Sequence, residues 1–175
     1  MLTNNRIFTF LIFAGIFSSL YFIGSQTKLP DKESELFLKE FRIIVERIDT
    51  MIIFEHNSFL VLPMFVPGFG LVWGSYVAWS TGLSFGALVL TNPSLEKISP
   101  LSLLYLSPYG LMEFISYSIG MSRSFLLINA LIRKRSLKNE IRQTAIEIGI
   151  VLALLLASAF IEFYMIRQFG FNLIQ

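Results

Sequence analysis

The fold is decided by an uncharged, apolar run at residues 58–90, which reads SFLVLPMFVPGFGLVWGSYVAWSTGLSFGALVL. As a single helix this run would be roughly 50 Å long, far more than the ~30 Å hydrocarbon core of a bilayer. The run must therefore bend or break. Pro63, Pro67 and Gly68 predict one break, because proline removes a backbone donor, and residues 80–82 predict a second.

Small side chains recur at every fourth position within this run. They place a ridge of small residues along one side of any helix that contains them: Gly70, Gly74, Ala78, Gly82 and Gly86. In membranes, such a pattern lets two helix backbones approach closely. We expect a helix-packing face that contacts another helix of the same chain, and contact with another subunit is the alternative, since both use the same physics.

The composition indicates that the solvent around this chain is lipid. Of its 175 residues 54% are apolar and 15% charged, and the mean hydropathy is +0.67. A soluble domain of this size could not hide so much apolar surface. The net charge of +2 gives no footprint for nucleic acid, and the absence of cysteine excludes disulfides and thiolate metal sites. We therefore expect a single integral membrane domain over residues 1–175.

Three further stretches predict membrane segments. Residues 7–24 form the first, residues 101–132 form a long stretch interrupted at Pro108, and residues 144–166 form the last. A signal peptide is the alternative for the first, but its 18 uncharged residues exceed a usual signal core. The expected fold is an all-α, polytopic transmembrane helical bundle of about five membrane segments, with some broken helices.

The longest polar segment, residues 26–57, predicts an amphipathic helix between the first two spans. Its apolar residues recur at helical spacing, at Phe37, Phe41, Ile44, Ile48, Met51 and Ile52. Such a helix can lie in the membrane interface, cover its own bundle or cap a partner subunit.

A basic loop predicts the orientation. Five cations and one acid, Glu140, lie between two apolar segments: Arg133, Lys134, Arg135, Lys138 and Arg142. The positive-inside tendency predicts that loop 132–142 is cytoplasmic, with the plasma membrane as the default location. If Arg6 is also cytoplasmic, an even number of crossings must precede the loop. The first span with three further segments satisfies this, near 59–79, after Thr81 and near 109–131. If that region instead crosses only twice, the amino terminus lies outside and the amphipathic helix is cytoplasmic.

Charged residues inside predicted spans are costly and usually have a partner or a function. Glu113 follows the break at Pro108, where free helix donors favour a capping acid, and a functional site is the alternative. Arg123 can extend toward the cytoplasmic surface or pair with an acid. We expect a structural ion pair between Arg123 and Glu147, and Arg167 is the simplest partner for Glu162.

Three short motifs are similar to those of a known family. They are His56-Asn57, a glycine-rich span with Gly74 and Gly82-x-x-x-Gly86, and Pro108-Tyr109-Gly110-x-x-Glu113. Together they resemble the stage II sporulation protein M family over about two-thirds of the chain, from Phe54 onward. In that family the last motif commonly reads Pro-His-Gly-x-x-Glu, so Tyr109 replaces a histidine here. The resemblance implies a polytopic membrane protein with an assembly role, like the sporulation member that serves cell-wall-remodelling enzymes during engulfment.

The sequence contains no known catalytic template: no nucleophile elbow, phosphate loop, paired histidines or dinucleotide fingerprint. His56 is the only histidine, which favours an interface role over metal binding. We therefore expect no enzyme activity, cofactor or metal, and no nucleic-acid partner. The expected function is a membrane scaffold or accessory subunit that binds other integral membrane subunits. A transporter or permease subunit and a small structural subunit of a membrane-bound enzyme complex are the alternatives.

Overall fold

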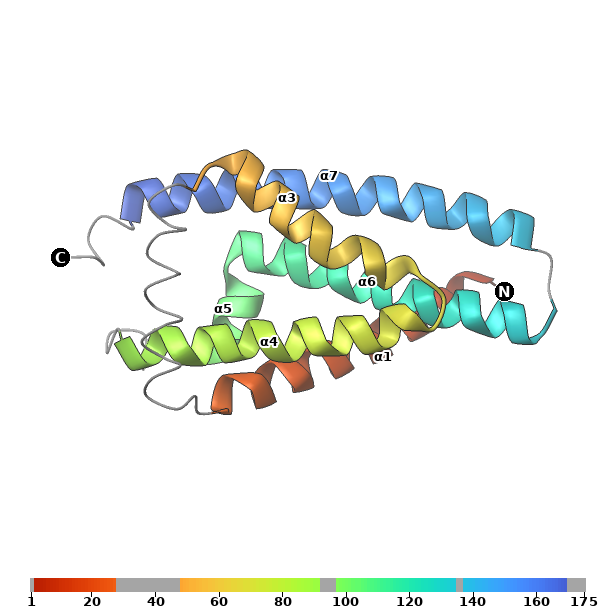
Figure 1. Cartoon of the computed structure of the whole chain (residues 1–175), viewed down its shortest axis with the longest axis horizontal. Coiled ribbons are helices and arrows are strands. Elements are labelled where there is room, and N and C mark those ends of the chain that lie inside the picture. The colour runs from red at the N-terminus through yellow and green to blue at the C-terminus, as the bar shows by residue number, and fades with distance from the viewer. Residues whose placement is uncertain (1, 28–47, 92–96, 135–136, 170–175) are drawn as a thin grey trace.

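The computed structural model describes residues 2–27, 48–91, 97–134 and 137–169 (Figure 1). These residues form six α-helices, one short 3-10 helix and no strand, which confirms the prediction of an all-α helical bundle. The elements are α1 (Leu2–Gln26), α3 (Thr50–Val61), η1 (Leu62–Phe65), α4 (Phe69–Thr91), α5 (Pro100–Leu106), α6 (Pro108–Ile132) and α7 (Leu137–Phe169).

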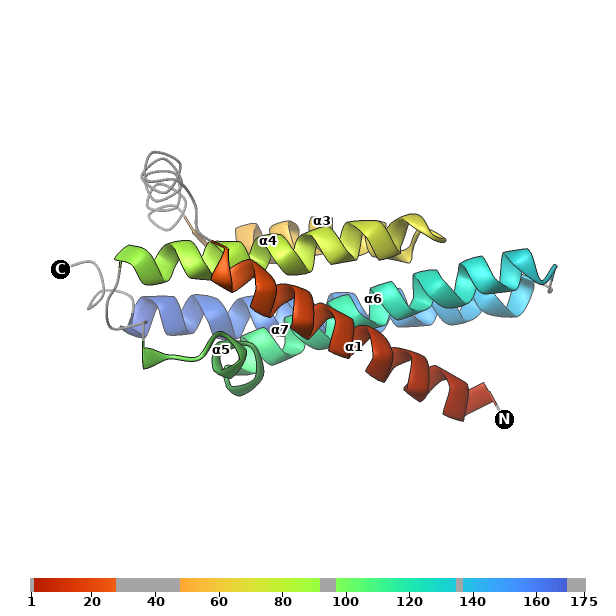
Figure 2. The ribbon, with the colours of Figure 1, turned by 90° about the horizontal axis from the view of Figure 1, so that it is seen from below.

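The long helices lie side by side in alternating directions. α1, α4 and α7 run from the end that holds the amino terminus, and α3 and α6 run back toward it (Figures 1 and 2). Three helices of the described ranges are long and apolar enough to cross a membrane: Arg6–Gln26, Pro108–Ile132 and Lys138–Gln168. We call the end with the α6–α7 turn the basic end, and the amino terminus lies at this same end (Figure 2).

Two of the three expected helix breaks are present. The chain leaves α3 through η1 and reverses at Gly68, whose φ of +76° suits glycine. The second break separates α5 from α6 at Ser107, whose hydroxyl accepts a hydrogen bond from the Gly110 amide at 3.1 Å. Both predictions, at Pro63–Gly68 and at Pro108, are confirmed.

The predicted break at residues 80–82 is wrong, because α4 is continuous from Phe69 to Thr91. The hydroxyls of Ser80 and Thr81 donate to the Val77 carbonyl at 3.1 and 2.8 Å, so the helix satisfies its own polar side chains. The expected segments near 59–79 and after Thr81 are therefore replaced by the antiparallel pair of α3 with η1 and α4.

Apolar side chains from the long helices form one core. Phe17 of α1 is 1% exposed and stacks on Tyr117 of α6 with ring centroids 5.6 Å apart. Val77, Met121 and Leu155 bring α4, α6 and α7 to the same core. The first span thus packs as one of the helices of the bundle.

Most of the predicted amphipathic helix lies outside the described residues. Of its apolar positions, Met51 and Ile52 belong to α3, where both side chains are exposed. α3 begins after Asp49, whose carboxylate accepts a hydrogen bond from the Ile52 amide at 2.8 Å. The helix continues to Val61, so the boundary expected at residue 57 falls inside a helix.

Candidate functional site

The small-residue ridge of α4 packs against α1 over its second half. A Cβ added at Gly82 would overlap the carbonyl oxygen of Tyr21, and one at Gly86 would lie 2.7 Å from the carbonyl oxygen of Ser25. On α1, a Cβ at Gly24 would in turn overlap the carbonyl oxygen of Trp79. The two backbones are therefore in direct contact, and this contact is made within one chain.

The first half of the same ridge contacts other elements. A Cβ at Gly70 would overlap the backbone of Met64 in η1, and one at Gly74 would overlap the side chain of Met121 in α6. Ala78, between the two halves, is fully buried. The five predicted packing positions thus hold η1, α6 and α1 around α4.

A second ridge of small residues, not noticed in the sequence, lies on α7. Its members occur at four-residue intervals and are all exposed: Ala145, Gly149, Ala153 and Ala157. Nothing lies within 4 Å of a Cβ added at Gly149. The spacing that predicted the α4 ridge would also have found this one, which we call the outer face of α7.

The expected pair of Arg123 and Glu147 is in contact in the structure. Arg123 Nε donates to Glu147 Oε2 at 2.8 Å, and Arg123 Nη2 donates to Glu147 Oε1. Arg123 Nη1 donates to Glu140 Oε2 at 3.0 Å. The Arg123 side chain is 2% exposed, so it pairs inside the bundle and does not extend to the surface.

Arg6 of α1, which sequence reasoning left unpaired, completes this group. Its Nε and Nη2 donate to the two oxygens of Glu147 at 2.8 and 2.9 Å, and its Nη1 donates to Ser122 Oγ at 2.6 Å. Two arginines thus balance two glutamates, and bidentate geometry favours such pairs. We call Arg6, Ser122, Arg123, Glu140 and Glu147 the charge cluster, which joins α1, α6 and α7 at the basic end.

Two of the family motifs meet in a second polar group. Asn57 Nδ2 donates to Glu113 Oε1 at 2.7 Å, and Tyr117 Oη donates to Asn57 Oδ1 at 3.1 Å. Ser158 Oγ of α7 lies 3.1 Å from the same Glu113 oxygen. We call Asn57, Glu113, Tyr117 and Ser158 the motif cluster, which joins α3, α6 and α7.

The other motif residues shape or flank this cluster. Pro108 begins α6, and Gly110 donates its amide to the capping Ser107. The Tyr109 carbonyl is 3.2 Å from Ser158 Oγ, whereas His56 lies exposed on α3. The cap of α6 is a serine, so the expectation that Glu113 caps this helix is wrong.

The expected pair of Glu162 and Arg167 is also wrong. The Arg167 guanidinium lies 5.1 Å from the centroid of the Phe163 ring, and no ion pair joins it to Glu162 in the described ranges. A cation over an aromatic face at this distance is attracted by the ring. Within the same ranges, no group of three His, Cys, Asp or Glu side chains could hold a metal ion.

A family model described as Stage II sporulation protein M matches residues 7–165. The match therefore extends the resemblance, seen in the sequence from Phe54 onward, to the first span. No curated protein and no solved structure matches the chain. With the motif residues Asn57 and Glu113 in contact and the match spanning most of its length, the chain belongs to the stage II sporulation protein M family.

Proposed function

We propose that this membrane protein is a non-catalytic scaffold or accessory subunit of a larger integral membrane complex. It would lie in the plasma membrane, with the basic end in the cytoplasm, and bind other integral membrane subunits. Membership of the family supports a membrane protein. Three helices with the length and composition of membrane spans support the same environment.

The use of the polar side chains supports an assembly role. In the charge cluster, arginine and glutamate side chains from three helices neutralise one another. In the motif cluster, Glu113 accepts hydrogen bonds from α3 and α7. Groups arranged in this way hold helices in register, because separating the helices would leave polar atoms unpaired in lipid.

The outer face of α7 is the observation that carries the proposal. α7 is 33 residues long, yet only 22% of its most apolar window is buried, compared with 56% for α6. Its exposed small residues repeat the four-residue spacing of the α4 ridge, where Gly82 and Gly86 contact α1. Since small residues let helices approach closely, this face suits a transmembrane helix of another subunit.

A transporter subunit is the second candidate, and the motif cluster is the observation that favours it. Glu113 and Asn57 are polar groups within the bundle, and such groups mark substrate pathways in some membrane proteins. A structural subunit of an enzyme complex would bind its partner through the outer face of α7, in the same way as a scaffold. The two assembly roles differ only in what the bound partner does.

Native purification in mild detergent, followed by mass spectrometry of the co-eluting proteins, tests the proposal. We expect a stoichiometric integral membrane partner, and its identity separates a scaffold from a subunit of an enzyme complex. A solitary oligomer that transports solute when reconstituted into liposomes would contradict the proposal and favour transport.

A further inference from the structure

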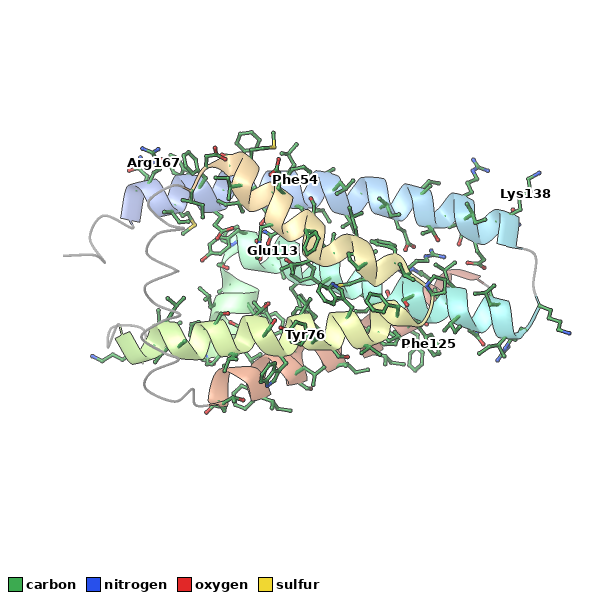
Figure 3. All side chains as sticks on the ribbon, in the orientation of Figure 1. Phe54, Tyr76, Glu113, Phe125, Lys138 and Arg167 are labelled. Atoms are coloured by element: carbon green, nitrogen blue, oxygen red, sulfur yellow. The ribbon has the colours of Figure 1, made fainter. Side chains whose placement is uncertain are left out.

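Among the described residues around the turn between α6 and α7, the exposed charged side chains are all basic. Arg133, Lys134, Lys138 and Arg142 are all exposed, and none of them forms an ion pair with another described residue. Figure 3 shows the Lys138 side chain at the far end of the bundle, extending away from α7. We call these four residues the basic turn.

The one acid in this part of the sequence is turned away from the basic turn. Glu140 accepts a hydrogen bond from the buried Arg123 at 3.0 Å, and its negative charge is paired with that arginine inside the charge cluster. The outward surface therefore keeps its positive charge without an acid to neutralise it. Lys138 and Arg142 lie one helical turn apart on the same side of α7, so one anionic group could contact both.

Exposed apolar side chains lie directly beside these cations. Ile132 at the end of α6 is 74% exposed, and Ile141 and Ile146 of α7 are 63% and 54% exposed. Cations next to an apolar band reproduce the layering of a phospholipid, in which a phosphate lies above acyl chains. A soluble acidic protein would match the cations but would leave the isoleucines in water.

We propose that the basic turn binds the headgroup phosphates of anionic phospholipids in the leaflet that surrounds the basic end. The cations contact the phosphates, and Ile132, Ile141 and Ile146 contact the acyl chains below. This site lies at the basic end of α7, one helical turn before Ala145 of the outer face, and the charge of its cations does not depend on the scaffold role. A juxtamembrane cation strengthens binding to an anionic surface by about 1 kcal/mol, which corresponds to about fivefold in affinity.

The test uses the purified full chain in detergent, titrated with phosphatidylglycerol or with zwitterionic phosphatidylcholine. Native mass spectrometry measures the lipid bound to each protein. We expect the wild type to bind phosphatidylglycerol more tightly than phosphatidylcholine. Lys138→Gln and Arg142→Gln should each weaken phosphatidylglycerol binding by about fivefold, whereas Arg142→Lys should leave it unchanged. Arg167→Gln removes an exposed cation at the opposite end and serves as the matched control, with no expected effect.

Single substitutions are preferred because removal of all four cations could change how the chain inserts. Equal binding of the two lipids by the wild type would overturn the proposal. It would also be overturned if Lys138→Gln and Arg142→Gln bound phosphatidylglycerol as tightly as Arg167→Gln. Displacement of phosphatidylglycerol by poly-glutamate but not by further anionic lipid would point to an acidic protein and likewise overturn it.

Discussion

α4 and α7 carry the same pattern of small residues and use it in opposite ways. On α4 the missing side chains of Gly82 and Gly86 let the backbone of α1 lie in direct contact. On α7 the equivalent face is open, and the helix is held on its other side by Glu147 and Ser158. A four-residue repeat of small side chains therefore predicts a contact face, but it does not tell which helix will fill it.

Substitutions in the charge cluster, which holds α7 to α6 and α1, should reduce stability the most. Arg123→Ala removes the buried guanidinium that joins Glu140 to Glu147 and leaves Glu147 paired with Arg6 alone, and we expect a loss of up to about 3–5 kcal/mol in the free energy of unfolding. Adding Glu147→Ala should cost less than the same substitution in the wild type, because only the contacts of Glu147 with Arg6 are then left to lose. Unfolding in detergent of the two single variants and the double variant measures the coupling. Fully additive losses would show that the two side chains do not act as a pair.

The next largest loss of stability is expected from the close packing of α4 against α1. Gly82→Ala places a methyl group on the Tyr21 carbonyl, which neither backbone can avoid without separating α1 from α4. Overpacking of this kind costs about 1–3 kcal/mol, and a thermal unfolding series in detergent would measure it. An unchanged melting temperature would contradict the backbone contact.

The motif cluster tests whether α3 joins α7 through polar groups. Asn57→Ala removes a donor to Glu113 and the acceptor of Tyr117, and we expect a loss of about 1–3 kcal/mol. The neighbouring His56→Ala is the control, since an exposed side chain away from such contacts changes stability by only about 0.5 kcal/mol. If the two variants unfolded alike, the cluster would not stabilise the bundle.

The open ridge gives the smallest expected effect, with the opposite sign. Gly149→Ala adds a methyl group where nothing lies within 4 Å and replaces a poor helix former. The isolated chain should gain up to about 1 kcal/mol in stability. Gly82→Ala is the same chemical change, so the two variants compare the two ridges directly. A loss of stability with Gly149→Ala in the isolated chain would contradict the open face at this position.

Local patterns in the sequence predicted much of this fold. The helical class, the break at Pro63–Gly68 and the break at Pro108 followed from apolar length and proline chemistry, which act within a few residues. The pairing of Arg123 with Glu147 followed from two neighbouring helices joined by a short loop.

Contacts between distant segments could not be predicted in the same way. Asn57 and Glu113 are separated by 56 positions, and Arg6 and Glu147 by 141. Glu113 was expected to cap α6 because local chemistry permits it, but Ser107 already fills that position and α3 supplies a donor. Residues 80–82 were expected to break a helix because their hydroxyls and glycine suggest a turn, whereas packing against α1 favours a continuous α4.

The central claim, that the outer face of α7 binds another membrane subunit, is tested most directly by partner retention. Gly149→Leu would fill this face, and Gly15→Leu makes the same change on α1, at another glycine with nothing within 4 Å of an added Cβ. After native purification, we expect mass spectrometry to show the stoichiometric partner with the wild type and Gly15→Leu, and its loss with Gly149→Leu. Retention of that partner by Gly149→Leu, with the chain folded, would contradict the account.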